Sequence, residues 1–292
     1  MQLIILSFCD NIFSVMKKNK PIIALLYDFD KTLSTTDMQN YTLIPRLGLS
    51  TDEFWGRASE YTNKYGMERT LSYMYAMISV AKEKNIKLTK EFLAECGQNI
   101  EFYPGVTTWF QRINEYAASK GIDVEHYLIS SGTKEIVEGS PIAKEFKEIY
   151  GCEFYFEDGV AVWPKFVINF TQKTQYYYRV AKGATNPVDD DGVNKKSETH
   201  RIPYRNIIYL GDGITDIACM TVVKKNDGHS IAVYPEGESN KVKQILLDNR
   251  CNFIVKGDYT EGSDMDKVIK NVIDKIAIIE QLDEQQRTLA EK

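Results

Sequence analysis

The stretch Pro21-Ile-Ile-Ala-Leu-Leu-Tyr-Asp-Phe-Asp-Lys-Thr-Leu-Ser34 decides the fold that we predict for this chain. Its first seven residues form a continuous apolar run, which is typical of a strand buried on both faces of a parallel sheet. Two carboxylates, Asp28 and Asp30, follow the run directly with the apolar Phe29 between them. Since residues two apart in an extended chain share a side, both carboxylates are expected to leave the strand together.

Further apolar runs of strand length recur along the chain, and helical patterns separate them. Alternation of strand and helix predicts an α/β fold with a mostly parallel sheet and right-handed crossovers. Residues Phe154–Phe170 alternate in places around the turn-forming pair Asp158-Gly159, which predicts a β-hairpin. The predicted parallel strands after the first are Glu125–Ser130, Asn206–Leu210, Ser230–Tyr234 and Asn252–Val255.

About a hundred residues separate the first two predicted strands, too many for one crossover helix. Residues 38–101 have helical periodicity and few strand formers, so we expect a separate helical insert. Thr51–Tyr65 is one predicted helix, with Ser50 and Glu53 placed for a capping box. A second is Met67–Lys84, whose expected apolar face is Leu71, Met74, Tyr75 and Ile78. The crossover helix back to the sheet is then Val106–Lys120.

Two segments near the end of the chain differ in character. Gly183–Tyr204 is polar and rich in turn formers, and we interpret it as a solvated surface loop. Met265–Leu289 carries an apolar stripe at helical spacing and predicts a long amphipathic helix. Packing on the core is the simpler explanation for that stripe, and a dimer contact is the alternative.

Composition narrows the class of protein. The 292 residues carry 36 Lys+Arg against 41 Asp+Glu, a net charge of −5 that gives no bulk attraction to nucleic acid or anionic membrane. We therefore expect neither as a partner. The cysteines are scattered, which does not favour a zinc site and suggests reduced thiols in a cytoplasmic protein. They are Cys9, Cys96, Cys152, Cys219 and Cys251.

The first fifteen residues do not fit the rest of the chain. Their apolar run Leu3–Leu6 is interrupted by Asp10 and is far shorter than the ~20 residues that span a bilayer. The lysines follow the apolar run, whereas a secretory signal has its positive charge ahead of it. We expect translation to begin at Met16, with residues 1–15 a disordered or artefactual extension.

A second acid pair lies in Gly211-Asp-Gly-Ile-Thr-Asp216, directly after a predicted strand. Ligands of open α/β sheets bind at the carboxyl ends of strands, where both acid pairs are expected to lie. Buried acids are costly unless something neutralises them, and Mg²⁺ does so with oxygen ligands. Asp28 and Asp30 alone could be a surface accident, and Asp216 alone a helix cap. Two such pairs together favour a magnesium site.

Two further segments could contact a phosphate. Ser130-Ser-Gly-Thr133 offers hydroxyls and backbone N–H groups at a strand-to-helix turn, although a helix cap explains it equally well. Lys173 lies at another predicted strand-to-helix turn, where its ammonium could neutralise a phosphoryl group. A lone lysine is usually a solvated side chain, so its interpretation depends on the other segments.

Taken in order, DFDKTLS, LISSGT, a lysine and GDGITD resemble the motifs of the haloacid-dehalogenase-like hydrolase superfamily. The similarity spans residues 21 to about 235, and the branch it most resembles is that of the phosphoserine phosphatases. The resemblance implies a Rossmann-like core with helices on both faces of the sheet, formed by residues 16–37 and 102–292. The helical insert, residues 38–101, takes the position of that family's small all-helical cap.

The resemblance also implies a role for each matching residue. Asp28 resembles the nucleophile that becomes an aspartyl-phosphate, and Asp30 the general acid and then base. Ser130 resembles the phosphate-binding hydroxyl. Lys173 resembles the lysine of the third motif, and Lys182 is the alternative.

Mg²⁺ is the implied cofactor. Asp212 resembles its ligand, joined by the Asp28 carboxylate and the Asp30 backbone carbonyl, while Asp216 supports the metal's waters or Lys173. Asp37 stands where phosphoserine phosphatases have a glutamate for the substrate amine, which suggests an amino-bearing substrate. The residues expected at the substrate are Thr32, Ser131, Gly132 and Asp37.

The function expected from the sequence is a magnesium-dependent phosphomonoester hydrolase. A cap of some sixty residues suits a small phosphorylated metabolite rather than a protein surface. Two alternatives stay open: a phosphotransferase on the same chemistry, and a non-catalytic protein that binds a small ligand. We expect a monomer or homodimer in the cytoplasm.

Overall fold

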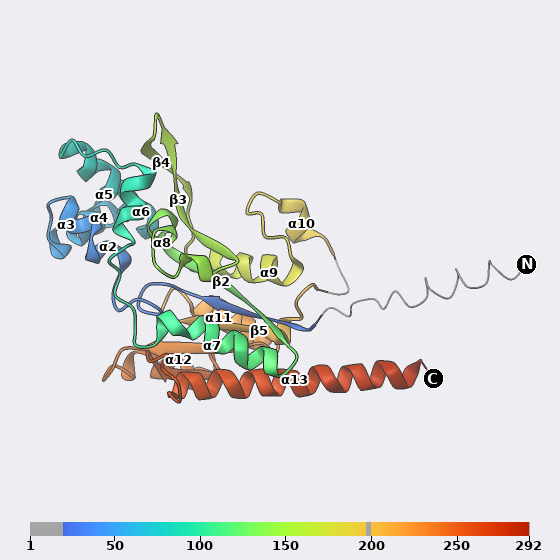
Figure 1. The fold of residues 1–292 in the computed structure, drawn as a ribbon. Helices are drawn as coiled ribbons and strands as arrows, with labels where there is room; N and C mark the ends of the chain where they lie inside the picture. The colour runs from blue at the N-terminus through green and yellow to red at the C-terminus, as the bar shows by residue number, and fades with distance from the viewer. Residues whose placement is uncertain (1–19, 197–199, 292) are drawn as a thin grey trace, which may run out of the picture.

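The computed structural model describes residues 20–196 and 200–291, and its centre is a seven-stranded sheet (Figure 1). The strand order is β4-β3-β2-β1-β5-β6-β7. Neighbouring strands pair in parallel, except that β3 and β4 are antiparallel. This confirms the mostly parallel α/β fold. The strands are β1 Ile22–Tyr27, β2 Asp123–Thr133, β3 Glu148–Glu157, β4 Val160–Phe166, β5 Ile207–Gly211, β6 His229–Tyr234 and β7 Phe253–Lys256.

The apolar run Ile22–Tyr27 forms the central strand β1. Ile23 to Tyr27 are completely buried, since β2 and β5 flank the strand and helices cover it. Tyr27 lies opposite Leu128 of β2 and Leu210 of β5. The three strands therefore reach the same edge of the sheet in register, and the residues that follow them meet there.

The predicted hairpin is confirmed, but its first strand is longer than expected. Asp158 and Gly159 both have positive φ, 49° and 77°, as a two-residue hairpin turn of matching twist requires. β3 begins at Glu148 and first pairs in parallel with β2, before it continues into the hairpin with β4. The sequence analysis missed this half because a charged residue opens it and no continuous apolar run marks it.

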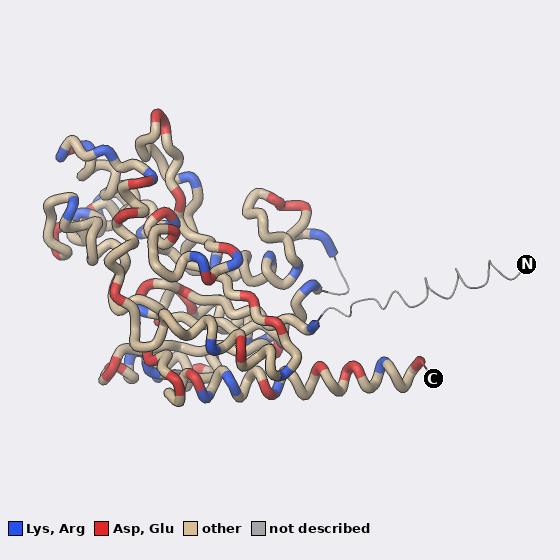
Figure 2. The backbone as a smooth tube through the Cα atoms, viewed as in Figure 1, with Lys and Arg blue, Asp and Glu red and all other residues tan. Residues whose placement is uncertain are grey.

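Helices cover both faces of the sheet. α7 and α13 contact each other, and α9 contacts α11, with α9 and α13 on opposite sides of the sheet (Figure 1). The predicted tail helix is confirmed as α13, and both acidic and basic residues lie along it (Figure 2). The helices outside the insert are α7 Val106–Ser119, α8 Lys134–Glu138, α9 Gln172–Lys182, α10 Asp190–Asn194, α11 Ile217–Lys225, α12 Asn240–Leu247 and α13 Asp264–Ala290.

The insert between β1 and β2 is helical and gathers beside the carboxyl ends of the strands (Figure 1). The capping box of α4 is present, with Glu53 N donating to Ser50 Oγ and Ser50 N donating to Glu53. The predicted apolar face of α5 is partly wrong, because Tyr75 is exposed whereas Tyr73 and Met77 are buried. The insert's helices are α2 Met38–Tyr41, α3 Leu43–Arg46, α4 Thr51–Tyr65, α5 Arg69–Glu83 and α6 Lys90–Cys96.

Two further sequence predictions concern the polar loop at residues 183–204 and the extension at residues 1–15. The predicted loop at residues 183–204 contains the short helix α10, because the buried Arg179 donates to the Asn186 and Asp189 carbonyls just before that helix. The extension predicted at residues 1–15 lies outside the described residues. Among the helices described, none combines the length and apolar character needed to cross a membrane.

Candidate active site

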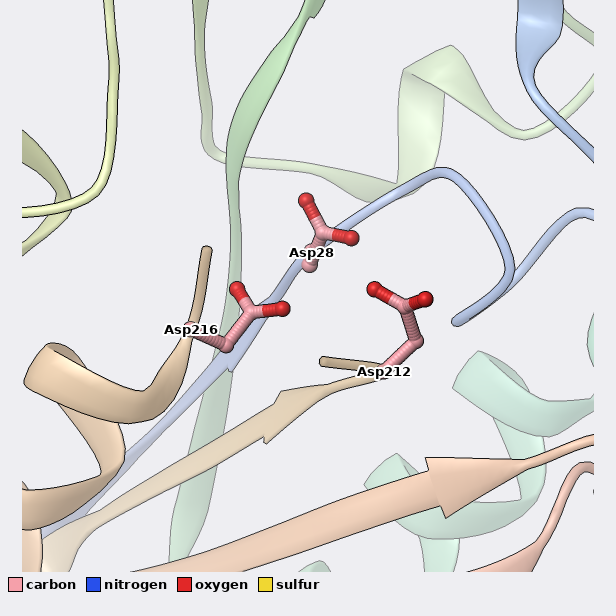
Figure 3. A group of neighbouring side chains, drawn as sticks. All are labelled: Asp28, Asp212 and Asp216. Atoms are coloured by element: carbon pink, nitrogen blue, oxygen red, sulfur yellow. The ribbon is translucent and has the colours of Figure 1, made fainter. Parts of the chain in front are cut away.

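Three aspartates meet where β1 and β5 end. Asp28 follows β1, and its backbone N–H donates to the Leu210 carbonyl of β5 at 2.8 Å. Asp212 follows β5, and Asp216 stands at the start of α11. Their carboxylates face one another (Figure 3), and one oxygen from each lies within 4.8 Å of the other two. The sheet register therefore brings Asp28 of the first acid pair and both acids of the second pair into one cluster.

A buried lysine joins two of these acids. Lys173, on the first turn of α9, has no exposed surface, and its Nζ lies 2.6 Å from Asp28 Oδ1 and 2.7 Å from Asp216 Oδ1. Burial alone would lower the pKa of Lys173, but the charges of Asp216 and Asp28 outweigh it and raise that pKa. The Lys182 Nζ instead donates to the carbonyls of Val193 and Lys195 at 2.5 and 3.1 Å.

Asp216 uses both of its oxygens on protein donors. The Tyr209 hydroxyl donates to Oδ1 at 2.6 Å, and Oδ2 accepts from Gly213 N at 3.3 Å and Thr215 Oγ1 at 3.4 Å. Gly211 makes this possible, because a Cβ there would lie 2.4 Å from the Asp216 Cγ. The arrangement suits Asp216 to hold Lys173 in place. The role of Tyr209 was not predicted from the sequence, since an aromatic ring in a buried strand has the pattern of a core residue.

The acid cluster is short of positive charge. Burial raises the pKa of Asp28 to about 6, against the attraction of Lys173. Burial raises the pKa of Asp212 well above its usual value, and the charges of Asp216 and Asp28 add to this. Oxygen donors with raised pKa values, close together at a strand edge, fit a hard divalent cation such as Mg²⁺. Asp28 and Asp212 are the residues that could hold it, because both line the cavity described below, whereas Asp216 is fully buried and does not line it.

Asp30 and the end of β2 face the same space. Ser130 to Thr133 were predicted as a strand-to-helix turn, but they belong to the strand itself, which runs to Thr133. Asp30 Oδ1 accepts from Met38 N at 2.7 Å, and Ser130 Oγ accepts from Gly132 N at 2.9 Å. Burial raises the pKa of Asp30 well above its usual value, with the charges of Asp37 and Asp28 adding to this. Thr32 is fully buried and donates to Asp28 Oδ2 at 3.3 Å, so it supports the carboxylate.

A cavity of about 630 Å³ opens over these groups. Six of the residues singled out in the sequence line it: Asp28, Asp30, Asp37, Ser130, Ser131 and Asp212. Gly132 lines an adjoining cavity beneath the cap. A cavity of this size suits a small ligand.

Lys31 is a second residue that the sequence analysis missed. Its positive φ of 57° turns the chain directly after Asp30, and its Nζ lies 2.7 and 2.9 Å from the Asp37 oxygens. Asp37, predicted to contact the substrate, lines the cavity, but it already has a cationic partner. A substrate amine would have to compete with Lys31. The only sequence signal for this pair was the i to i+6 spacing of a lysine and an acid around a tight turn.

Comparison with known proteins places the chain in a family. The sequence model of the haloacid dehalogenase-like hydrolases matches residues 25–221, which include every residue of the cluster. The chain therefore belongs to the haloacid dehalogenase-like hydrolase family. It is 23% identical over 291 residues to an uncharacterized protein of Borreliella burgdorferi, covering 90% of this chain and 99% of that one.

Solved structures share the fold at low sequence identity. A hydrolase of this family from Salmonella enterica serovar Typhi superposes with a TM-score of 0.55 at 16% identity, covering 82% of this chain and 68% of the other. A substrate-bound phosphoserine phosphatase gives 0.52 at 14% identity, covering 87% and 99%. A phosphoserine phosphatase with an analogue of its phospho-aspartyl intermediate gives 0.51 at 17% identity, covering 86% and 99%.

Proposed function

We propose that this protein is a magnesium-dependent phosphatase that hydrolyses a small organic phosphate through an aspartyl-phosphate on Asp28. The observation that carries the proposal is the buried Lys173, whose ammonium bonds Asp28 and Asp216 at the edge of the catalytic cavity. A structural ion pair has no need of further acids such as Asp30 and Asp212, or of an open cavity, beside it. Family membership and the fold shared with phosphoserine phosphatases support the same reaction class.

The nucleophile is the Asp28 carboxylate. Lys173 holds Oδ1 and Thr32 holds Oδ2, so the group is oriented before substrate binds. An Asp28 oxygen forms the new bond to phosphorus while the bond from phosphorus to the substrate alcohol breaks. The ammonium of Lys173 also offsets negative charge that gathers on the phosphoryl oxygens.

Asp30 acts as the general acid for the leaving alcohol and then as the general base for the attacking water. Its raised pKa favours a protonated carboxyl, which can donate to the departing alcohol oxygen. The resulting carboxylate then takes a proton from the water that attacks the aspartyl-phosphate, so phosphate leaves and Asp28 is regenerated. The Met38 N–H fixes one Asp30 oxygen and leaves the other for this exchange.

The chain's own residues provide for the metal and the phosphate. Asp28 and Asp212 would hold Mg²⁺, which supplies positive charge to the acid cluster and to the phosphate oxygens. Ser130 and the backbone of the last residues of β2 would bind the phosphate. We propose a small phosphorylated metabolite in the cytoplasm as the partner, neither nucleic acid nor a membrane, with the protein a monomer or homodimer.

A phosphate-release assay with and without chelator tests the reaction class. A panel of small phosphomonoesters is offered to the full chain with Mg²⁺, and Asp28→Asn is run beside it. We expect Mg²⁺-dependent release that disappears in Asp28→Asn. Release by Asp28→Asn at the wild-type rate would refute the nucleophile. Added alcohol acceptors distinguish the alternative phosphotransferase, because transfer would yield a new phosphate ester at the expense of free phosphate.

A further inference from the structure

The catalytic cavity continues into the cap through two further cavities. The first, of about 270 Å³, lies between cap and core and is reached past Asp30 and Ser131. The second, of about 390 Å³, lies within the cap against α4 and the start of α5. Trp55, Arg69 and Tyr73 line both cap cavities. A three-carbon alcohol would leave most of this space unfilled, since pockets of a few hundred Å³ take larger ligands.

Trp55 gives the boundary between the two cap cavities a rigid aromatic wall. Its Nε1–H donates to Asn40 Oδ1 at 2.9 Å, which fixes the indole. The Tyr73 ring stands edge-on to it at 6.1 Å between centroids, and the Tyr73 hydroxyl donates to the Ser131 carbonyl at 2.7 Å. Two aromatic side chains with tethered polar tips form a surface on which a flat ring can stack.

Arg69 brings a positive charge to the same wall. It begins α5, four residues before Tyr73, so the two side chains share a face of the helix. The neighbouring Glu68 carboxylate is engaged in capping α5, accepting from Thr70 N at 2.8 Å and Leu71 N at 3.0 Å. Across residues 20–196 and 200–291, no carboxylate forms an ion pair with Arg69. Its guanidinium is therefore available to a ligand with hydrogen-bond acceptors.

Gln39 adds a hydrogen-bond acceptor that has no partner within the part of the chain that the structure describes. It is 2% exposed and lines the cavity between cap and core, yet its Oε1 has no hydrogen-bond partner. A buried amide oxygen without a partner is costly, so a ligand N–H or O–H placed there would be stabilising. The wall thus offers an aromatic face, a cation and a buried acceptor, which together match a planar polar ring.

We propose that the substrate is a phosphate ester whose alcohol carries a flat heterocyclic ring, the chemical class of the nucleoside monophosphates, with the ring held at Trp55, Arg69 and Gln39. This proposal rests on the phosphatase function proposed above and names the class of its substrate. The phosphate lies at Asp28 and the sugar beside Asp30 and Ser131. The ring then reaches the boundary between the two cap cavities.

The decisive comparison is a nucleoside 5′-monophosphate against ribose 5-phosphate. Ribose 5-phosphate has a hydroxyl at C1 in place of the nucleotide's heterocyclic base. With wild-type protein we expect kcat/KM for uridine or adenosine 5′-monophosphate to exceed that for ribose 5-phosphate by about tenfold or more. Trp55→Leu and Arg69→Gln should each remove most of that preference while turnover of ribose 5-phosphate stays within about twofold. Arg57→Gln is the matched control, because Arg57 is on α4, pairs with Glu83 and lines none of these cavities.

Binding to Asp28→Asn separates this proposal from the function on which it rests. Calorimetric titration of that variant with the same two compounds needs no turnover, and we expect the nucleotide to bind about tenfold more tightly. Equal affinities, or a preference that survives in Trp55→Leu and Arg69→Gln, would overturn the ring site. Absence of turnover with the binding preference intact would instead count against the phosphatase. Trp55→Phe keeps an aromatic wall and should retain the preference, which excludes a mere folding defect in Trp55→Leu.

Discussion

Lys173 Nζ lies 2.6 Å from Asp28 Oδ1, although 145 positions separate the two residues in the chain. Both side chains are buried, and the same ammonium bonds Asp216 at 2.7 Å. Removing one partner of a buried ion pair leaves an uncompensated charge in a region of low dielectric constant. This contact therefore couples catalysis to stability at one point of the structure.

Replacing Lys173 with methionine should damage both properties. We expect kcat to fall at least about 100-fold, since a preorganised cation at the reacting phosphate is lost. The free energy of unfolding without Mg²⁺ should fall by about 3–5 kcal/mol, because Asp28 and Asp216 lose their shared partner. Urea unfolding and phosphate release measure the two effects.

Lys182→Met is the control for that variant. Lys182 belongs to the same helix but bonds only backbone carbonyls among the described residues, so its loss should leave kcat unchanged. The opposite ranking, with Lys182→Met inactive and Lys173→Met active, would show that the catalytic lysine has been misassigned.

Asp212→Asn should weaken Mg²⁺ binding. In wild-type protein the ion should stabilise the fold by about 2.7 kcal/mol at 100 times its Kd, seen as a rise in Tm. The variant should show little of that rise, because a carboxylate ligand becomes a neutral amide. Asp248→Asn is a matched control, since Asp248 also lines the cavity but lies outside the acid cluster and accepts from Gln244. An undiminished rise in Asp212→Asn would exclude Asp212 as a metal ligand.

Tyr209→Phe tests how Asp216 is held. Loss of the hydroxyl removes the 2.6 Å bond to Asp216 Oδ1 and frees that carboxylate to turn away from Lys173. We expect kcat to fall about tenfold with KM unchanged, and stability to fall by about 1 kcal/mol. Tyr127 lies opposite Leu26 of β1, as Tyr209 does on the other side, and its hydroxyl bonds Glu125 instead. Tyr127→Phe should therefore leave kcat unaffected; equal kcat losses in both variants would contradict a specific role for Tyr209.

The loss of folding stability at acidic pH should arise in part outside the catalytic cavity, at His126. Burial lowers the pKa of this histidine to about 3, from an ordinary value of 6.5. Between these two values the unfolded chain binds more protons than the folded protein, so its free energy of unfolding falls as the pH falls. The contribution reaches about 1.4 kcal/mol per pH unit.

The pH dependence of His126→Gln isolates that contribution. Urea unfolding between pH 7.5 and pH 4 should give a shallower loss of stability in the variant than in wild-type protein. His229, whose pKa burial lowers to about 4, acts in the same direction in both proteins and cancels in the comparison. Identical slopes would mean that His126 has the same pKa in the folded and unfolded states.

Local sequence patterns determined much of the architecture. The continuous apolar run at residues 21–27 indicated a strand buried on both faces, since it contains no charged residue, and its residues Ile22–Tyr27 form the central strand β1. Acid pairs after two such strands predicted a shared site, because the carboxyl ends of parallel strands meet at one edge. The turn pair Asp158-Gly159 and the capping box at Ser50 were also predicted correctly, since each depends on interactions among a few neighbouring residues.

Tertiary structure alone decided the finer chemistry. Whether Lys173 or Lys182 enters the cluster depends on where α9 lies against β2 and α11, which no local pattern encodes. The pairing of Asp37 with Lys31 arises from a turn with positive φ. Trp55 and Arg69 line one wall only because α4 and α5 pack together over the core. Such contacts join residues whose separation in sequence carries no information, so packing free energy, and not local propensity, fixes them.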